Sequence, residues 1–313
     1  MLGSLFPQAY TDSPQSSNLN DFLRLEIQSG RSKFGRGEIP IIEQRISQQI
    51  ETGLPINLAV IAIAHKNPQS EISGNRKIPD LAEVAFLLHL RKILDGINLF
   101  YPPGAIFTIL TEGGFYKIGD IFDVTEGEIK EYEERFKFLA RIILGNRIRF
   151  ESLGNIVNNP NFYGVYQENL SSISEDDFRH FIPVMERSIT NKQRAMGITP
   201  YDMAKRYAAL HVAKHHCLDD GGSAVYKFLD EALGENYIYC SITGNSRSEV
   251  LNIDTGIKGS PPPQHGEGVL MSGSAVVRVL NQEQMENAKL RPIYVTEYGN
   301  EPIGHEKLGE RRK

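Results

Sequence analysis

Basic side chains gather in one short polar segment, "HKNPQSEISGNRK" (65–77), which contains Lys66, Arg76 and Lys77. Ammonium and guanidinium groups bind phosphates and carboxylates through charge-assisted hydrogen bonds. The segment is therefore a candidate site for an anionic small molecule. A solvated connection between two elements has a similar composition, so these residues alone leave both interpretations open.

Acids and bases that could transfer protons occur in two other segments. In "TEGGFY" (111–116), Glu112 precedes two glycines that leave room for a substrate, although a simple turn has the same pattern. In "GSPPPQHGEGVLMSG" (259–273), three prolines restrict the chain before His265, and Glu267 lies two residues further on. Imidazole titrates near neutral pH, which suits it to proton transfer. A surface proline turn is the alternative for this segment.

A weaker group of candidates lies in "MERSITNKQR" (185–194). Arg187, Lys192 and Arg194 fall on an expected helix, where they could bind an anion. A solvated helix face has the same charges.

His211 and His215 lie one helical turn apart, a spacing at which two imidazoles can reach one metal ion. Zinc proteases have a Glu directly after the first His, and this chain has Val212 there. An exposed, His-rich helix end explains the pair better, because positive charge suits the C-terminal end of a helix. We therefore predict no metal site.

Fingerprints of common cofactors are missing from the sequence. There is no Gly-x-Gly-x-x-Gly turn after an expected strand and no phosphate-loop Gly-Lys-Ser/Thr signature. Dinucleotides and nucleoside triphosphates thus have little support as ligands, and we predict no cofactor.

Strands and helices alternate in the first half of the chain. "INLAVIAIA" (56–64) is short, continuous and rich in β-branched residues, which is typical of a strand buried on both faces. Further strands are expected over 105–110 and 147–153, and helices over 41–53, 80–95 and 126–144. Two of the helices follow capping pairs, Asp80 with Glu83 and Thr125 with Glu128. This order predicts an α/β fold with a Rossmann-like parallel sheet and crossover helices.

In such a sheet, ligands bind beyond the carboxyl ends of the strands, where a helix N-terminus adds backbone donors and a favourable dipole for an anion. Lys66 lies two residues past the first expected strand, and Glu112 follows the second. Both are therefore expected at the same edge of the sheet.

Strands in the C-terminal half are expected to extend this sheet. Helices are expected over 175–191, 200–218 and 223–233, and strands over 237–243, 249–253, 268–271, 274–280 and 293–298. Visible alternation and short loops favour antiparallel pairing for several of these strands. We predict a mobile N-terminal arm over 1–20, a Rossmann-like α/β half over 21–153, and a helical segment with mixed strands over 154–313 that completes the same domain.

Composition and charge exclude several classes of protein. Apolar residues make up 40% of the 313 residues, and the formal charge is −5 with basic residues scattered among acidic ones, so nucleic acid is not an expected partner. The longest apolar run, 58–64, is far shorter than the roughly 20 residues of a membrane-spanning helix. Residues 1–21 lack a basic start followed by an apolar stretch, and only two cysteines are present, so a cytosolic location is expected.

Together, several of these segments resemble the isonitrile (isocyanide) synthases of the pyoverdine/dityrosine biosynthesis family. The resemblance lies in a buried strand followed by "HKNP", a glycine-containing linker, "PDLAE" at a helix start, "YPPGA" before the next strand and "TEGGF" after it. It is clearest over residues 56–145, with weaker similarity in "YIYCSIT" and "PPPQH".

This resemblance implies an enzyme that converts the α-amine of tyrosine or tryptophan to an isonitrile, with ribulose 5-phosphate as the one-carbon donor and without a metal or nicotinamide. Its substrates would be small molecules, and an iron- and 2-oxoglutarate-dependent oxygenase would be a pathway partner. Lys66 matches the lysine of the family after the first strand, Glu112 the acidic residue before glycine, and His265 the histidine after a proline-containing turn.

The sequence also departs from the family pattern. A second lysine is expected near Glu71 and Ile72, where Arg76 or Lys77 could replace it from another point of the loop. Gly114 stands where an arginine is expected, and the strand that carries an arginine and ends in histidine has Tyr239 and Thr243. These departures leave two alternatives open: a sugar-phosphate or amino-acid lyase or isomerase on the same scaffold, and a non-catalytic small-molecule binding protein.

Overall fold

The computed structural model describes most of the chain between residues 40 and 308. The described residues are 19, 21–22, 40–61, 78–112, 121, 123–152, 162–218, 233, 237–241, 251–253, 267–271, 277–280, 284–285, 287–294 and 302–308. Leu19 is buried in the main hydrophobic core, so at least this residue of the expected N-terminal arm is packed. The other expected bounds of the arm and of the two halves remain predictions.

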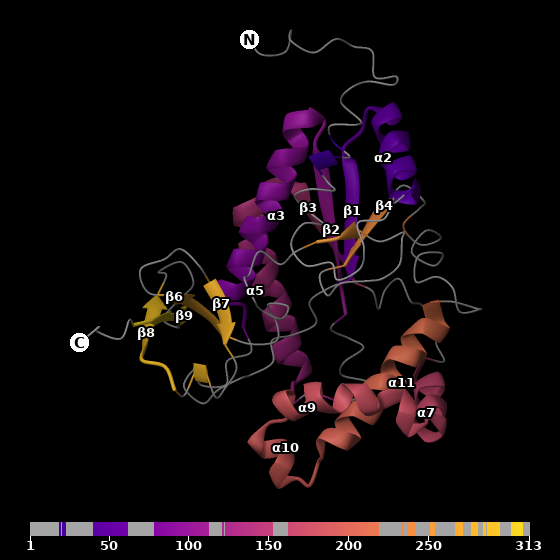
Figure 1. Cartoon of the computed structure of the whole chain (residues 1–313), viewed down its shortest axis with the longest axis vertical. Coiled ribbons are helices and arrows are strands. Elements are labelled where there is room, and N and C mark those ends of the chain that lie inside the picture. Colours follow the sequence, from indigo (N-terminus) through magenta and orange to yellow (C-terminus); the bar gives the residue numbers. More distant parts are fainter. Residues whose placement is uncertain are drawn as a thin grey trace.

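Eight helices and nine strands have bounds within these residues (Figure 1). The helices are α2 (Pro40–Thr52), α3 (Leu81–Phe100), α5 (Glu126–Leu144), α7 (Phe162–Ser172), α8 (Glu175–Phe178), α9 (Ile182–Ser188), α10 (Asn191–Ala195) and α11 (Pro200–Leu218), with 3₁₀ turns η2 (Gly145–Arg147) and η3 (Arg179–Phe181). The strands are β1 (Ile56–Ile61), β2 (Ala105–Thr111), β3 (Ile148–Ser152), β4 (Tyr237–Ser241), β5 (Leu251–Asn252), β6 (Glu267–Met271), β7 (Val277–Leu280), β8 (Leu290–Tyr294) and β9 (Pro302–Lys307).

A parallel sheet forms the centre of the molecule, with the strand order β3-β2-β1-β4-β5. β1 lies in the middle, and its register pairs Ile56 with Ala105 of β2 and Asn57 with Tyr237 of β4. Central strands of this kind are covered on both faces, which explains their continuous apolar sequences. The predicted α/β class, with a parallel sheet and crossover helices, is confirmed.

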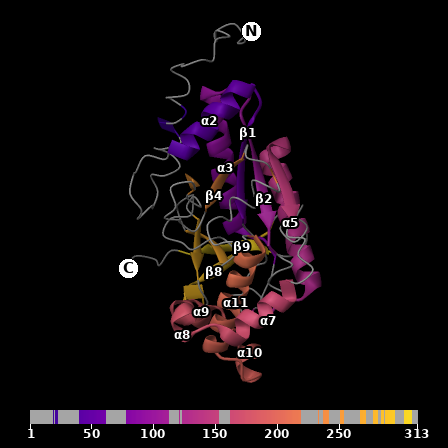
Figure 2. The ribbon, with the colours of Figure 1, turned by 90° about the vertical axis from the view of Figure 1, so that its right-hand side faces the viewer.

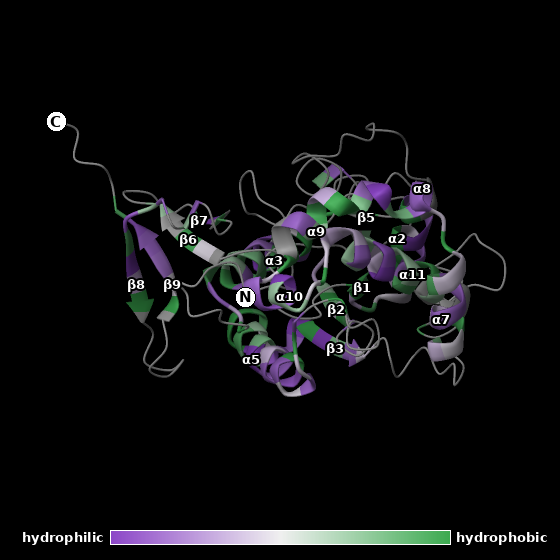
Figure 3. Ribbon diagram, turned by 90° about the horizontal axis from the view of Figure 1, so that it is seen from below, coloured by the Kyte–Doolittle hydropathy of each residue, from purple (hydrophilic) through white to green (hydrophobic). Residues whose placement is uncertain are grey.

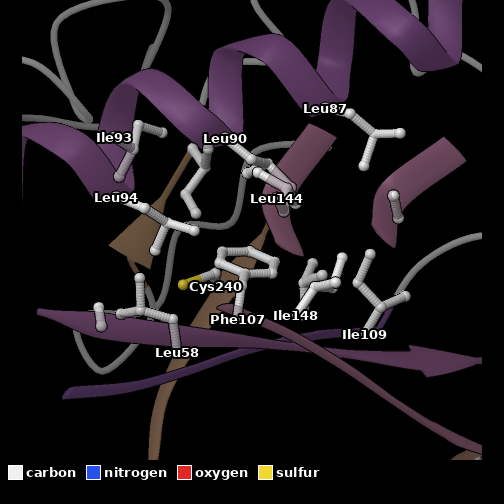
Figure 4. Close-up of a cluster of buried hydrophobic side chains, with 14 of the residues drawn as sticks. Leu58, Leu87, Leu90, Ile93, Leu94, Phe107, Ile109, Leu144, Ile148 and Cys240 are labelled. Atoms are coloured by element: carbon white, nitrogen blue, oxygen red, sulfur yellow. The ribbon is translucent and has the colours of Figure 1, made fainter. Parts of the chain in front are cut away.

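One face of this sheet packs against α3 and α5 (Figure 4). Side chains that alternate along the strands meet apolar side chains of the two helices; they are Leu58, Phe107, Ile109, Ile148 and Cys240 from the strands, with Leu87, Leu90, Ile93 and Leu94 from α3 and Leu144 from α5. Burial raises the pKa of the Cys240 thiol, which donates a hydrogen bond to the Ile238 carbonyl oxygen at 3.6 Å. Cys240 is therefore a packed thiol of low reactivity.

The alternate side chains of the same strands belong to a second core. Ala59, Leu110 and Tyr239 cluster with apolar residues of helices α7, α8, α9 and α11. Helix α2 lies beside β4 (Figure 1); its buried isoleucines belong to the first core, while the Arg45 guanidinium lies 5.5 Å from the centroid of the Tyr239 ring. The sheet therefore has helical cover on both faces.

The remaining strands form a separate sheet beside α3, on the side away from α7 and α11 (Figure 3). Its order is β7-β6-β9-β8, with β6–β7 and β8–β9 antiparallel and β6–β9 parallel. Antiparallel pairs thus exist in the C-terminal half as expected, but they do not extend the first sheet. The C-terminal strands that do extend it, β4 and β5, are parallel.

Smaller differences from the expected elements have local causes. The helix expected over 175–191 is divided into α8, η3 and α9, and α9 has Pro183 in its first turn, where proline starts a helix. β9, "PIGHEK", was not expected because proline, glycine and charged residues have low strand propensity. The expected helix at 223–233 lies outside the described residues, except for Leu233. No described helix is long and apolar enough to cross a membrane.

Replacing Thr125 with alanine is expected to lower the free energy of unfolding by about 1 kcal/mol. Thr125 Oγ1 accepts a hydrogen bond from the Glu128 backbone N–H at 3.3 Å, and the Thr125 N–H donates to Glu128 Oε2 at 2.7 Å. Urea unfolding of Thr125→Ala beside Thr125→Ser, which retains the hydroxyl, measures the effect. Equal stability of the two variants would show that the α5 cap does not contribute.

Candidate active site

The carboxyl ends of the five parallel strands lie at one edge of the main sheet, and α3 begins there. After β1, the chain adds β2 and β3 on one side of β1 and then β4 and β5 on the other side. The crevice between the ends of two strands that leave in opposite directions is where open α/β sheets bind ligands. The ends of β1 at Ile61 and of β4 at Ser241 flank this point. Helices α9, α10 and α11 lie at the end of the molecule toward which these strands run (Figure 2).

Of the predicted site residues, only Glu112 is described together with its side chain. It directly follows β2, is half-buried, and stands at the same sheet edge as Ile61 because Leu110 pairs with Ile61. Glu267 begins β6, and Arg187 lies in α9; their backbones are described and their side chains are not. Lys66, Arg76, Lys77 and His265 lie outside the described residues. Their roles therefore remain predictions.

A buried hydrogen bond joins the two chain segments that carry these predicted residues. Asp80 Oδ2 accepts from the Gly268 backbone N–H at 2.9 Å, across 188 positions of sequence. Asp80 lies three residues after Lys77, and Gly268 three residues after His265. The bond therefore holds together the first residues of α3 and β6, which follow the two segments in the sequence.

Glu83 extends this bond into a buried network. Its Oε2 accepts from the Asp80 backbone N–H at 2.7 Å, and its Oε1 accepts from the Tyr132 hydroxyl of α5 at 3.0 Å. Both carboxylates are almost completely buried, at 3% exposure for Asp80 and 0% for Glu83. Buried charges of this kind require such partners, because unpaired ones are very unfavourable.

This network changes the expected chemistry of the α3 N-terminus. The Asp80 carboxylate accepts the backbone N–H groups of Ala82, at 2.7 Å, and of Glu83. These helix donors, which we expected to be available to an anionic ligand, are thus taken by a carboxylate of the protein. Two negative side chains at this point would also repel a second anion. The first backbone donors of α3 are therefore not available to an anionic ligand.

Two of the three weaker basic candidates, Lys192 and Arg194, have structural partners. The Lys192 ammonium contacts Asp123 Oδ1 at 2.6 Å, and this hydrogen bond and the charge of Asp123 raise the pKa of the exposed lysine. Arg194 Nη2 donates to the Glu186 carbonyl oxygen at 3.4 Å. Neither contact supports a role in anion binding.

His211 is half-buried in α11 rather than part of an exposed helix end. Its ring lies 4.4 Å from the Tyr207 ring and 6.1 Å from the Phe181 ring, between ring centroids. The side chain of His215 is not described. Within the described part of the chain, no group of three or more His, Cys, Asp or Glu side chains could hold a metal ion.

Comparison with known families agrees with this architecture. A family model described as "Pyoverdine/dityrosine biosynthesis protein" matches residues 46–212, which are 167 of the 313 residues. The chain belongs to this family. The match runs from α2 into α11, and so includes β1, the capped start of α3 and Glu112. His265 and Glu267 lie beyond it.

Two curated relatives of the family align with part of the chain. The L-tyrosine isonitrile synthase of Xenorhabdus nematophila is 29% identical over 131 residues, which are 42% of this chain and 37% of the relative. The L-tyrosine isonitrile synthase of Pseudomonas aeruginosa is 31% identical over 124 residues, which are 38% of this chain and 37% of the relative. The aligned part thus spans little more than a third of each curated relative.

A solved structure extends the similarity of fold to nearly the whole chain. The crystal structure of the PvcA protein from Pseudomonas aeruginosa matches with a TM-score of 0.67 and 18% identity, over 94% of this chain and 100% of that chain. At this identity, the comparison establishes the family fold and no more.

Sequence reasoning identified Asp80 and Glu83 as a helix cap and missed their second role. Their bonds to Gly268 and Tyr132 connect α3 to β6 and α5. The local capping pattern is enough to explain why both residues are acidic. The sequence around these two residues therefore gives no separate indication of their tertiary contacts. The glycine after Glu267 was a usable signal, since glycine in a strand often marks close approach of another backbone.

Proposed function

We propose that the protein is an isonitrile synthase that converts the α-amine of L-tyrosine to an isonitrile, with ribulose 5-phosphate as the one-carbon donor. Membership of the family carries the proposal, supported by two relatives that are L-tyrosine isonitrile synthases. The sequence order also supports it, because the basic segment follows β1 in the chain and the strand order reverses at β1. Tryptophan is the second amino acid to test.

The proposed reaction makes definite demands on the site. The substrate amine attacks the sugar ketone and water leaves, which forms an imine. Proton transfers, loss of inorganic phosphate and cleavage of the two carbon–carbon bonds at the former ketone carbon then leave this one carbon on the nitrogen and release the other four sugar carbons. Positioned acids and bases are needed for the proton transfers, and we assign them to Glu112, His265 and Glu267. No metal or nicotinamide is needed for these steps.

Two anionic groups must be bound: the sugar phosphate and the amino-acid carboxylate. We assign their binding to Lys66, Arg76 and Lys77, with Arg187 as a further candidate from α9. Side chains are required for this task because the Asp80 and Glu83 carboxylates already accept the first backbone donors of α3. Lys66 stands nearest to the end of β1 in the sequence, and is therefore the first of these residues to test.

The decisive experiment supplies the purified protein with L-tyrosine and uniformly ¹³C-labelled ribulose 5-phosphate. Mass spectrometry of the tetrazine adduct should show an isonitrile that carries a single ¹³C atom. Parallel reactions with tryptophan define the accepted side chain, and omission of either substrate provides the control. Absence of isonitrile with every common amino acid would contradict the proposal. Consumption of the sugar phosphate alone would favour a lyase or isomerase.

Lys66→Ala is expected to raise the KM for ribulose 5-phosphate by roughly 10- to 100-fold, since a hydrogen bond to a charged group contributes about 1.5–3 kcal/mol. Steady-state kinetics with each substrate varied in turn measure the effect. Lys192→Ala is the matched control, because this lysine pairs with Asp123 at the surface. Unchanged kinetics in Lys66→Ala would remove this residue from the site.

A further inference from the structure

We propose that Asp80 is a positioning residue of this site. Its carboxylate holds the start of β6, whose first residue is Glu267, against the N-terminus of α3 at the carboxyl edge of the main sheet. The catalytic part of this inference rests on the proposed function, whereas the structural part does not.

The contacts of Asp80 divide between two tasks. Oδ1 accepts the Ala82 N–H at 2.7 Å, which caps α3, while Oδ2 accepts the Gly268 N–H at 2.9 Å, which holds β6. Serine caps a helix about as well as aspartate and has only one side-chain oxygen. The aspartate at this position therefore has a function that a simple cap does not require.

The backbone of β6 approaches α3 so closely that only glycine fits. A Cβ atom on Gly268 would lie 2.7 Å from Asp80 Oδ1 and 2.8 Å from the Leu81 carbonyl carbon. The neighbouring strand repeats the pattern, because a Cβ atom on Gly304 would lie 2.7 Å from Leu81 Cγ. Val269 pairs with His305 in register, so the two glycines lie side by side and form a flat surface on which the α3 N-terminus rests.

Asp80 is itself held in place by Glu83 and, through Glu83, by Tyr132. Its N–H donates to Glu83, and Glu83 accepts the Tyr132 hydroxyl, so the bond to Gly268 is the outer end of a network that begins in α5. A fully satisfied buried network of this kind fixes one geometry. The position of β6 relative to the main sheet is thereby determined by buried side chains.

This position matters because Glu267, which we assign to proton transfer, begins β6 directly before Gly268. A displacement of about 1 Å at a catalytic group lowers turnover by up to roughly 100-fold. Loss of the bond between Asp80 and Gly268 should thus affect proton transfer more than substrate binding.

Two variants separate the tasks of the carboxylate. Asp80→Ser keeps an oxygen for the helix cap and has none for Gly268. Asp80→Asn keeps the size of the side chain and can place an NH₂ group, instead of an acceptor, against the Gly268 N–H. Thr125→Ala is the control for damage to a helix cap alone, because Thr125 caps α5 through its own bond to Glu128.

The first measurement is hydrogen exchange in the peptide that covers residues 261–271, without substrates. Exchange at the Gly268 amide should be at least about tenfold faster in both Asp80 variants and unchanged in Thr125→Ala. Equal exchange in all proteins would overturn the inference. This comparison judges the contact even if the wild-type protein forms no isonitrile, which would instead refute the proposed function.

The second measurement is the kinetics of isonitrile formation. In Asp80→Ser, kcat should fall by roughly 10- to 100-fold while the KM for ribulose 5-phosphate stays within about twofold of the wild type. Thr125→Ala should retain the wild-type kcat. Faster exchange at Gly268 with an unchanged kcat would show that Asp80 holds β6 without positioning the site, and would overturn the catalytic part.

Discussion

His265→Ala is expected to lower the kcat for isonitrile formation by roughly 100- to 10,000-fold, the usual contribution of a general acid or base. The reaction requires repeated proton transfers on a carbon skeleton, and an imidazole is the side chain that both gives and accepts protons near neutral pH. The KM values should change little, because the residue acts on protons rather than on the anionic groups of the substrates.

The pH dependence of kcat separates this role from a structural one. The kcat of the wild-type protein should fall on one side of neutral pH, where the imidazole is in the protonation state that does not catalyse the reaction. The pH profile of His265→Ala should not show this fall. His180→Ala is the control, since His180 is exposed in η3 and its ring centroid lies 3.9 Å from that of Phe181. A His265→Ala variant with wild-type kcat, or with an unchanged pH profile, would remove the imidazole from the mechanism.

The first three strands and their helices could be predicted because their signals are local. Ile56, Leu58 and Val60 face one core and Ala59 the other, and continuous apolar strands of this type are specific to sheets covered on both faces. The helix starts at 81 and 126 follow capping boxes whose bonds the structure contains. Chain connectivity then limits the arrangement, since parallel neighbours require crossover helices.

The second sheet could not be predicted because alternation does not specify a partner. The alternating strands near the C-terminus fit the edge of any sheet equally well. Their place is decided by Gly268 and Gly304, which allow β6 and β9 to contact Leu81, and by one hydrogen bond across 188 positions. The sequence around Asp80 does not indicate that its partner is Gly268, and the sequence around Gly268 does not indicate Asp80.

The candidate site was predictable as an edge of the sheet and only partly as a set of residues. Glu112 lies where expected, directly after β2 and level with the end of β1. The backbone N–H groups at the α3 N-terminus were expected to bind an anion. They are not available, because the Asp80 and Glu83 carboxylates accept their hydrogen bonds. A capping box and an anion site use the same backbone groups, so a sequence pattern that predicts the first argues against the second.

This exclusion has a consequence for substrate binding. If the phosphate is held by lysine and arginine side chains rather than by a helix end, its affinity depends on charges that salt screens over about 8–10 Å.

Gly268→Ala is expected to lower the free energy of unfolding by roughly 2–6 kcal/mol. Overpacking contributes about 1–3 kcal/mol, because the new methyl group would meet the Asp80 carboxylate and the Leu81 backbone, which cannot move independently of α3. Displacement of β6 also breaks the bond to Asp80, and a buried acceptor left without its partner costs about 1–3 kcal/mol more. Urea unfolding, followed by circular dichroism, measures the loss.

Gly127→Ala provides the matched control for this substitution. Gly127 lies in the first turn of α5, where the nearest atom to a new Cβ would be Thr125 Oγ1 at 4.0 Å. Alanine should be tolerated there and should add about 0.4–1 kcal/mol, because it restricts the unfolded chain. If Gly268→Ala were as stable as Gly127→Ala, β6 would not be held tightly on α3. The network of Asp80, Glu83 and Tyr132 would then fix only the start of the helix, and the second sheet could place Glu267 elsewhere.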